Sequence, residues 1–368
     1  MKFEHKKNYL FIIPLKIVEF ISRFIMLFTR RKKSNKIILM IDVGHFGDQL
    51  MLTPAIKHLR ESEFSKDYQI YCITSHLGEK ALKNNPDIDK VFVVNKNWDS
   101  NYNNFRWVKN YFNLKSLIQN VNPEIAFSCR STAYHIETLA IFNSNISFRY
   151  GYSGKGLKKL LTNTLKYDLH SHRVDQNIDL VRLFTKSKST IPKTPLFYPD
   201  LNNVDTVRMN SYINDSKLVL INVFAEHDYI YNLDFYLNVV KHYKKQGFKV
   251  LFVGIEKNRV KVNKFLIKNG IGINSNLLGK TNIDELYYLL SKSKLLITVD
   301  TGVRHLANCL ELPVISFRKT PNYDSEFGKY LPSETIYNEK NNRLKYANTI
   351  NSVEKLNFKM LCKELNHK

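Results

Sequence analysis

Residues 36–61 read KIILMIDVGHFGDQLMLTPAIKHLRE, and this stretch decides the fold. A continuous apolar run over residues 37–43 predicts a strand that is buried on both of its faces. An amphipathic segment over residues 55–61 predicts a helix, with Pro54 in its first turn. The loop between them carries two glycines and one acid, Gly44, Gly47 and Asp48. A buried strand that is followed at once by a helix is typical of a parallel sheet.

The same alternation of apolar strands and amphipathic helices continues along the chain, and a Pro-containing segment over residues 189–203 interrupts it. We therefore predict an α/β protein with two Rossmann-like, doubly wound domains, over residues 36–195 and 196–368. Residues 1–35 precede them. Because ligands of such sheets bind beyond the carboxyl ends of the strands, the loops that follow the apolar runs are the candidate sites.

The N-terminal segment carries the membrane signal of the sequence. Residues 9–28, YLFIIPLKIVEFISRFIMLF, are long enough to span a bilayer, but Lys16, Glu19 and Arg23 would be costly at its centre. These three side chains share one helical face, and basic residues flank the segment on both sides. The pattern predicts an amphipathic helix that lies on an anionic membrane surface. The alternative is a tail helix that packs on its own domain.

Charge and cysteine content limit the possible partners. The 368 residues include 56 Lys and Arg against 33 Asp and Glu, a formal net charge of +23, which predicts attraction to polyanions. Because the aromatic residues do not interleave with the basic ones, no nucleic-acid partner is expected. The cysteines lie far apart, so neither a zinc site nor a disulfide framework is indicated, and we expect no metal and no cofactor. They are Cys72, Cys129, Cys309 and Cys362.

The best candidate for phosphate binding lies in LLITVDTGVRHLANCL, residues 295–310. A buried strand is predicted to end at Asp300, and a helix begins just beyond it, so free backbone N–H groups point at the loop. Thr301 and His305 add side-chain donors, and Gly302 lets a ligand approach the backbone. The structural alternatives are an N-cap at Asp300 or Thr301, a turn glycine and a surface histidine. The clustering of these residues at one strand end favours a phosphate site.

Several blocks together resemble one enzyme family. GHFGDQLMLTPAIKHLR (44–60) resembles the opening signature of glycosyltransferase family 9, the lipopolysaccharide heptosyltransferases, and DTGVRHLANCLELPVISF (300–317) is similar to its second signature. NNPDIDKVFVVN, RYGYSGKG, HRVDQNIDLVRLF and LGKTNIDELYYLLSKSKLLITVD lie between them in the family's order. The likeness covers roughly residues 36–320.

The resemblance implies a GT-B fold, with two Rossmann-like domains and a central cleft. The N-terminal domain would bind the acceptor and the C-terminal domain an ADP-linked sugar. It also implies inverting transfer without a catalytic metal, with Asp48 as the general base. Gly44 and Gly47 would let the acceptor approach the backbone beside that carboxylate. The implied donor site comprises Asp300, Thr301, Gly302 and His305 at the phosphates and Glu256 at the ribose.

Two segments depart from the family pattern. Residues 222–236, NVFAEHDYIYNLDFY, carry Tyr229 about where the family has a basic residue shortly before a Trp-Pro pair. His227, Lys280 and Arg304 are the candidates to supply that charge to the donor phosphates. Residues 317–330, FRKTPNYDSEFGKY, lack the family's Gly-Pro-Thr ending. The donor therefore need not be heptose.

The predicted function is transfer of heptose, or a related sugar, from an ADP-sugar to the core of lipopolysaccharide or lipooligosaccharide. The predicted partners are the nucleotide-sugar donor, the lipopolysaccharide acceptor and an anionic inner-membrane surface. The enzyme would thus be cytoplasmic and peripheral on the inner face of the bacterial inner membrane. The alternatives are a transferase of another nucleotide sugar in capsule or surface-glycan synthesis, a non-enzymatic basic protein that binds glycan or nucleic acid, and an inactive family member.

Overall fold

The structure is a computed structural model, and it divides into two compact units. The first comprises Met1–Asp168 and Val174–Pro192, and the second comprises Leu169–Arg173 and Lys193–Lys368. The change of unit at Pro192 lies close to the predicted limit at residue 195. The residues that the structure describes are 34–94, 106–130, 135–153, 158–168, 170–187, 190–213, 217–224, 233–318, 330 and 334–338.

The described residues of the first unit form a six-stranded sheet in the order β3-β2-β1-β4-β5-β6, and each neighbouring pair is parallel. The chain order reverses direction between β1 and β4, so this is the switch point at which ligands of doubly wound sheets bind. The strands are β1 (Asn35–Asp42), β2 (Gln69–Thr74), β3 (Lys90–Val93), β4 (Pro123–Ser128), β5 (Phe148–Tyr152) and β6 (Asn163–Leu165).

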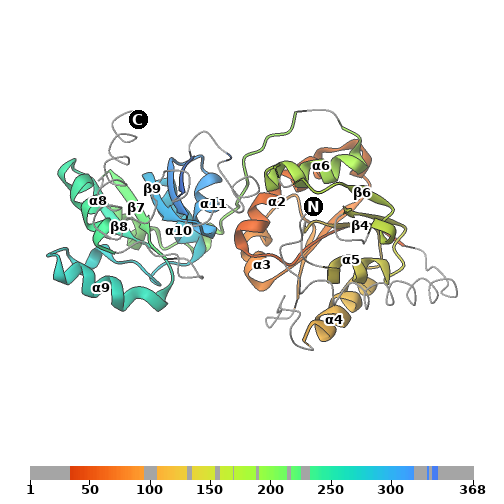
Figure 1. The fold of residues 1–368 in the computed structure, drawn as a ribbon, viewed down its shortest axis with the longest axis horizontal. Coiled ribbons are helices and arrows are strands. Elements are labelled where there is room, and N and C mark those ends of the chain that lie inside the picture. Colours follow the sequence, from red (N-terminus) through yellow and green to blue (C-terminus); the bar gives the residue numbers. More distant parts are fainter. Residues whose placement is uncertain are drawn as a thin grey trace. The chain divides into compact units, whose positions relative to one another are not determined.

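Helices cover both faces of this sheet (Figure 1). Leu39 and Ile41 of β1 pack with Leu114 and Ile118 of α4, while the alternate residue Met40 is equally buried on the opposite face. The helices are α2 (Phe46–Glu61), α3 (His76–Leu82), α4 (Arg106–Val121), α5 (His135–Phe142) and α6 (Arg173–Thr185), with 3-10 turns η2 (Glu63–Ser65) and η4 (Lys158–Leu160).

The start of α2 corrects one prediction. The helix begins at Phe46, so Pro54 lies in its interior and not in its first turn. A proline in a helix has no N–H for the carbonyl four residues earlier, which here belongs to Leu50. The Thr53 hydroxyl donates to that carbonyl over 2.7 Å, so the acceptor is satisfied and the helix continues. As a result, Gly47 and Asp48 belong to the first turn of the helix.

The described residues of the second unit form a five-stranded parallel sheet in the order β11-β10-β9-β7-β8. Its switch point lies between β7 and β9. The strands are β7 (Leu218–Asn222), β8 (Lys249–Phe252), β9 (Ser293–Val299), β10 (Val314–Arg318) and β11 (Glu334–Asn338). The helices are α7 (Thr206–Ile213), α8 (Leu233–Lys245), α9 (Arg259–Lys268), α10 (Ile283–Ser291) and α11 (Gly302–Asn308), with 3-10 turns η5 (Leu201–Asn203), η6 (Glu256–Asn258) and η7 (Ile273–Ser275).

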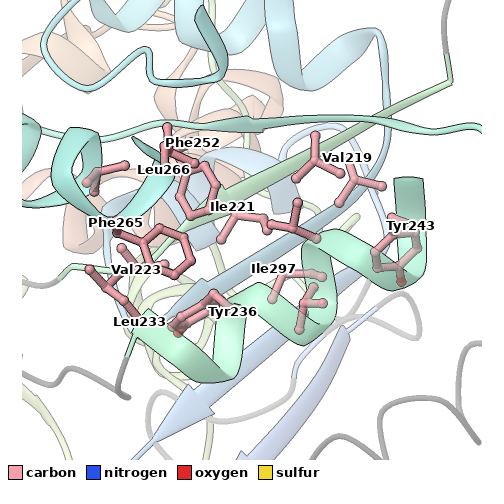
Figure 2. Close-up of a cluster of buried hydrophobic side chains, with 14 of the residues drawn as sticks. Val219, Ile221, Val223, Leu233, Tyr236, Tyr243, Phe252, Phe265, Leu266 and Ile297 are labelled. Atoms are coloured by element: carbon pink, nitrogen blue, oxygen red, sulfur yellow. The ribbon is translucent and has the colours of Figure 1, made fainter. Parts of the chain in front are cut away.

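The core of the second unit lies between its sheet and the helices α8 and α9, as Figure 2 shows. Ile221 of β7 and Phe252 of β8 are fully buried there, together with Tyr236 of α8 and Leu266 of α9. Each such side chain contributes about 1.5–3 kcal/mol when it leaves water. The predicted α/β class with two Rossmann-like, doubly wound sheets is therefore confirmed.

The predicted N-terminal amphipathic helix lies outside the described residues. None of the helices in the described ranges is both long and apolar enough to cross a bilayer.

Candidate active site

The loop that leaves β1 brings Asp48 to the switch point of the first sheet. Asp48 is half-buried in the first turn of α2, and its Oδ2 accepts a hydrogen bond from the His45 backbone N–H over 2.8 Å. His45 is the N-cap residue and Asp48 stands three residues further on. The carboxylate therefore closes the first turn, as the acid of a capping box does, without occupying the N-cap position itself.

Gly44 makes room for two carboxylates. A Cβ atom built on Gly44 would lie 2.6 Å from Oδ2 of Asp48 and 2.7 Å from Oδ1 of Asp42, distances that real Cβ atoms do not show. The space beside the Gly44 backbone is thus occupied by the side chains of Asp42 and Asp48. Gly47 is buried in the first turn of α2. The roles of both glycines toward an acceptor stay predictions.

Two acids at this switch point were missed by sequence reasoning. Asp42 is 1% exposed at the end of β1, and its Oδ1 accepts from the Gly44 N–H over 2.7 Å. Glu137 of α5 is fully buried, and its Oε1 accepts from the Val43 N–H over 3.2 Å. One feature of the sequence could have indicated Glu137. It is the single acid in the mostly apolar helix segment HIETLAIF, and a carboxylate in such a segment is rarely buried unless it has a polar partner.

In the second unit, the segment from the end of β9 into α11 holds four of the predicted donor residues, Asp300, Thr301, Gly302 and His305. Gly302 is the first residue of α11, and Thr301 is its N-cap residue, although its side chain makes no capping bond. Instead, the Thr301 Oγ1 accepts from Nδ2 of Asn222 over 3.1 Å. His305 is 7% exposed, so the alternative of a surface histidine is wrong.

Arg304 is a buried residue of α11 that bonds to this loop from the interior of the domain. Arg304 is fully buried, and its Nη1 donates to Oδ1 of Asp300 over 3.1 Å. Arg304 is a predicted candidate to supply charge to the donor phosphates, and in the structure its guanidinium forms an ion pair with Asp300. A buried guanidinium requires such a partner, since an isolated buried charge is very costly.

The remaining donor residues follow β8. Glu256 begins η6 and forms an ion pair with Arg259, Oε1 to Nη1 at 3.0 Å, while most of its carboxylate faces solvent. Gly279 has a φ of +66°, and a Cβ there would lie 2.5 Å from Cβ and 2.8 Å from Cα of Glu256. The Gly279 N–H also donates to the Gly254 carbonyl over 2.8 Å. The two loops are thus packed backbone against backbone, which only a glycine at position 279 permits.

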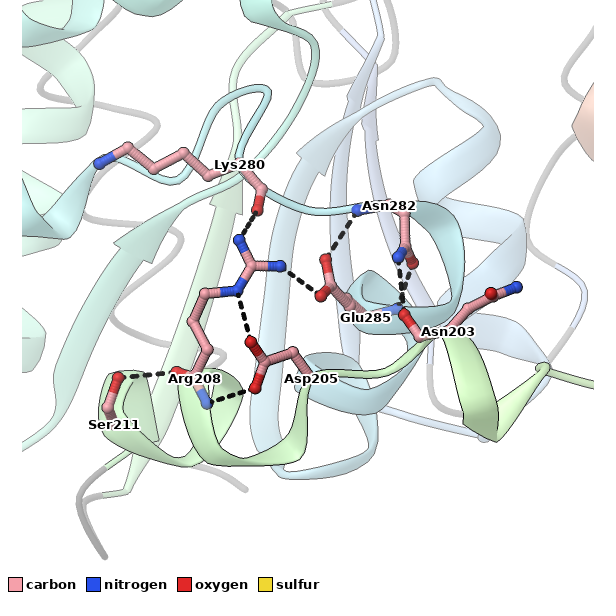
Figure 3. A network of polar contacts seen from close by, with 7 residues as sticks. All are labelled: Asn203, Asp205, Arg208, Ser211, Lys280, Asn282 and Glu285. Carbon is pink, nitrogen blue, oxygen red and sulfur yellow. Dashed lines mark hydrogen bonds and ion pairs between the residues drawn. The ribbon is translucent and has the colours of Figure 1, made fainter.

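Lys280 stands next to this contact and is held through its backbone. Its carbonyl accepts from Nη1 of Arg208 over 3.2 Å, while the Lys280 ammonium points away from that network (Figure 3). Arg208 also pairs with the buried carboxylate of Glu285, and Glu285 accepts from the Asn282 N–H over 3.0 Å. The network fixes the loop that carries Lys280 and leaves its side chain exposed.

The structure therefore joins the predicted donor residues of the second unit through a series of contacts. Thr301 is bonded to Asn222, and a Cβ at Gly254 would lie 3.2 Å from the Asn222 Oδ1. Gly254 is bonded to Gly279, which packs on Glu256. All lie at the carboxyl ends of β7, β8 and β9, where the topology predicts a ligand. His227 and Tyr229 lie outside the described residues. Among the described residues, no group of three or more His, Cys, Asp or Glu side chains is arranged to hold a metal ion.

Two doubly wound units with polar residues gathered at their strand ends match the architecture of the GT-B class. The chain belongs to glycosyltransferase family 9 (heptosyltransferase), whose family model matches residues 138–355. No curated protein sequence matches the chain.

Solved structures show the same fold at low sequence identity. A glycosyltransferase of family 9 from Veillonella parvula superposes with a TM-score of 0.69 and 16% identity, over 84% of this chain and 87% of that one. The ADP-heptose lipopolysaccharide heptosyltransferase II of E. coli gives 0.62 and 17%, over 89% and 99%. The E. coli heptosyltransferase WaaC with ADP-2-deoxy-2-fluoro heptose gives 0.65 and 12%, over 88% and 99%. The predicted GT-B fold is confirmed.

Proposed function

We propose that this glycosyltransferase transfers heptose from ADP-heptose to the core of lipopolysaccharide or lipooligosaccharide, with inversion and without a catalytic metal. The observation that carries the proposal is the position of Asp48, a half-buried carboxylate in the first turn after β1, at the switch point of the first sheet. Its orientation is fixed by the bond from the His45 N–H. Membership of the heptosyltransferase family supports the choice of donor and acceptor.

In the proposed reaction, Asp48 is the general base. It takes the proton from an acceptor hydroxyl while that oxygen attacks the anomeric carbon of the sugar from the face opposite ADP. The new C–O bond forms as the bond between the anomeric carbon and the phosphate oxygen breaks, and ADP leaves with the electron pair. General-base assistance of this kind contributes roughly 10²–10⁴-fold to a rate.

The second unit would bind the donor. We assign the phosphates to Thr301, Gly302 and His305, because an anion is favoured at the N-terminal end of a helix such as α11. Asp300 would orient this loop through its pair with Arg304. Glu256 would contact the ribose, and the exposed ammonium of Lys280 is the candidate to meet the phosphate charge in place of the basic residue that Tyr229 replaces.

The test is a donor panel with the purified full-length chain. With a truncated lipooligosaccharide acceptor, we expect consumption of ADP-heptose and a product that is one heptose heavier by mass spectrometry. Turnover with a UDP- or GDP-sugar alone would instead support the second candidate, a transferase for capsule or another surface glycan, which the loop around Tyr229 favours. Failure with every donor would contradict a transferase function.

The role of Asp48 is tested separately. Asp48→Asn should abolish turnover while ADP affinity stays within about twofold, because the donor site lies in the other unit. Glu63→Gln, which changes an exposed acid just beyond α2, is the matched control and should retain activity. Normal turnover of Asp48→Asn would leave the carboxylate with a structural role alone.

Membrane association is a further part of the proposal. The amphipathic helix predicted over residues 9–28 would lie at the inner face of the bacterial inner membrane, where the acceptor lipid is made. Deletion of residues 1–33 should release the protein from vesicles that contain anionic lipid, without loss of ADP binding. Continued binding of the truncated chain to those vesicles would refute this helix as the anchor.

A further inference from the structure

Three consecutive backbone N–H groups of the loop after β1 donate to three different carboxylates. The Val43 N–H donates to Oε1 of Glu137 over 3.2 Å, the Gly44 N–H to Oδ1 of Asp42 over 2.7 Å, and the His45 N–H to Oδ2 of Asp48 over 2.8 Å. Three acids therefore accept the backbone N–H groups that set the path of this loop. Asp48 accepts the last of the three bonds.

Of these three hydrogen bonds, only the one to Glu137 joins residues that are far apart in the sequence. Asp42 and Asp48 bond to amides two and three residues away, and such local bonds move with the loop. Glu137 lies 94 residues from Val43, on α5, a helix that packs against the sheet. It therefore fixes the loop to the body of the domain. On the other side, the Ser75 hydroxyl donates to the Gly44 carbonyl over 2.6 Å and provides a second tie to the domain.

The burial of Glu137 makes this bond costly to lose. The residue is 0% exposed, and its second oxygen, Oε2, contacts the Ser128 hydroxyl at 3.5 Å. A buried carboxylate is expensive unless its oxygens accept hydrogen bonds from the protein. If the bond were lost, the buried Val43 N–H would also lack its acceptor, at a further cost.

We propose that Glu137 is a positioning residue for Asp48. By accepting from the Val43 N–H, it holds the start of the loop against α5, so that the His45 N–H and the Asp48 carboxylate bonded to it keep the geometry that proton abstraction needs. The inference rests on the proposed function of Asp48. Glu137 itself touches no substrate in this scheme.

The kinetic test compares two replacements of Glu137. Glu137→Met fills the space without an acceptor, and we expect a fall in kcat of about 10²-fold, the size expected for a misplacement of about 1 Å. The KM for the donor should stay unchanged, because the donor residues lie in the other unit. Glu137→Gln keeps an oxygen acceptor for the Val43 N–H and should retain kcat within about fivefold of the wild type. A Gln variant as slow as the Met variant would overturn the proposal.

Thr138→Val is the matched control. Thr138 is the next residue of α5, is 8% exposed, and contacts the Ser128 hydroxyl at 3.3 Å without a described bond to the loop. This variant should leave kcat unchanged. An equal loss of kcat in Glu137→Met and Thr138→Val would indicate general loosening of α5 and contradict a positioning role.

Hydrogen exchange gives a readout that does not depend on activity. In Glu137→Met, amides in a peptide over residues 42–50 should exchange roughly ten to a hundred times faster than in the wild type, and in Glu137→Gln within about threefold. Unchanged exchange in the Met variant would overturn the proposal even if the enzyme transfers heptose. If the wild type shows no transfer, the proposed function fails, and the exchange data still decide whether Glu137 holds the loop.

Discussion

The Nδ2 of Asn222 donates to the Oγ1 of Thr301 over 3.1 Å, across the switch point between β7 and β9. Asn222 ends β7, and Thr301 is the residue before α11, so the bond joins two loops at which the topology predicts a ligand. The first unit has a counterpart, because the Val43 N–H after β1 is bonded to Glu137 of α5. In each unit a residue that follows a strand at the switch point is thus bonded to an element that is distant in the sequence, and such a preformed arrangement would lower the reorganisation cost of catalysis.

Asn222→Ala should weaken ADP binding by about three- to tenfold, because the Thr301 hydroxyl loses the donor that orients it. Isothermal titration calorimetry with ADP measures this. The matched control is Asn210→Ala, which removes an exposed 2.8 Å bond to the Tyr288 hydroxyl away from the strand ends and should leave ADP affinity unchanged. Equal affinities of both variants would show that the bond does not order the donor loop.

The inner strands of both sheets, such as β1 and β7, could be predicted from the sequence because they are buried on both faces and read as continuous apolar runs. Asp300 directly follows such a run, and Asp48 lies in the glycine-containing loop after the run over residues 37–43, where the family resemblance implies the general base. The start of α2 was wrong because Pro54 is typical of a first turn, and the Thr53 hydroxyl that satisfies the Leu50 carbonyl leaves no pattern in the sequence.

The missed residues depend on contacts between distant parts of the chain. Glu137 meets Val43 across 94 positions, and no local spacing indicates that pairing. Arg304 was predicted as a possible phosphate ligand because the sequence shows that it lies close to the loop. Its complete burial against Asp300 depends on tertiary packing, which the sequence does not show. The position of these loops could therefore be predicted from the sequence, whereas the hydrogen bonds and ion pairs between their side chains could be identified only from the structure.

Gly44→Ala should displace Asp48, because the new Cβ would lie 2.6 Å from its Oδ2 and 2.8 Å from its Cβ. We expect kcat to fall by about 10²-fold or more, with little change in ADP affinity. Steady-state kinetics and ADP titration test this. Gly272→Ala is the control, because nothing lies within 4 Å of its Cβ position, and it should behave as the wild type. Full activity of Gly44→Ala would mean that the loop can shift without harm to the base.

Gly279→Ala should disturb the loop that carries Glu256. The control is Gly270→Ala, because Gly270 has a φ of +64°, close to the +66° of Gly279, and nothing lies within 4 Å of its Cβ position. Both variants therefore carry the same conformational cost of about 1–2 kcal/mol for an alanine at positive φ. Of these two glycines, only Gly279 contacts the Glu256 backbone. Gly279→Ala should therefore lose more stability to urea, and it should weaken ADP binding while Gly270→Ala does not. Identical behaviour of the two would exclude a steric effect on Glu256.

Arg208→Met should leave the Glu285 carboxylate, whose side chain is 3% exposed, without its cationic partner. Glu285 raises the pKa of the Arg208 guanidinium, which reflects the strength of the pairing. Because the Arg208 side chain is 42% exposed, we expect a loss of about 1–3 kcal/mol in unfolding free energy, below the cost for a fully buried pair. Urea unfolding measures it. Asp205→Asn removes the charge from the exposed 3.6 Å contact to the same guanidinium and keeps an oxygen that can accept from the Arg208 N–H, so it should cost less than about 0.5 kcal/mol.

The first unit should lose stability at mildly acidic pH through His58. Burial, and then the charge of Arg182, lower the pKa of His58 below its usual 6.5, and its Nε2 lies 3.1 Å from the Thr185 hydroxyl. Since the unfolded chain binds the proton more readily, stability is complete above pH 6.5 and is lost as the pH falls from there toward the lower pKa of the folded state. Melting temperatures measured from about pH 8 to about pH 5 should thus decrease more steeply for the wild type than for His58→Gln. His76→Gln, which replaces an exposed histidine on α3, should keep the steep wild-type profile, and a flattened profile in that control would assign the effect elsewhere.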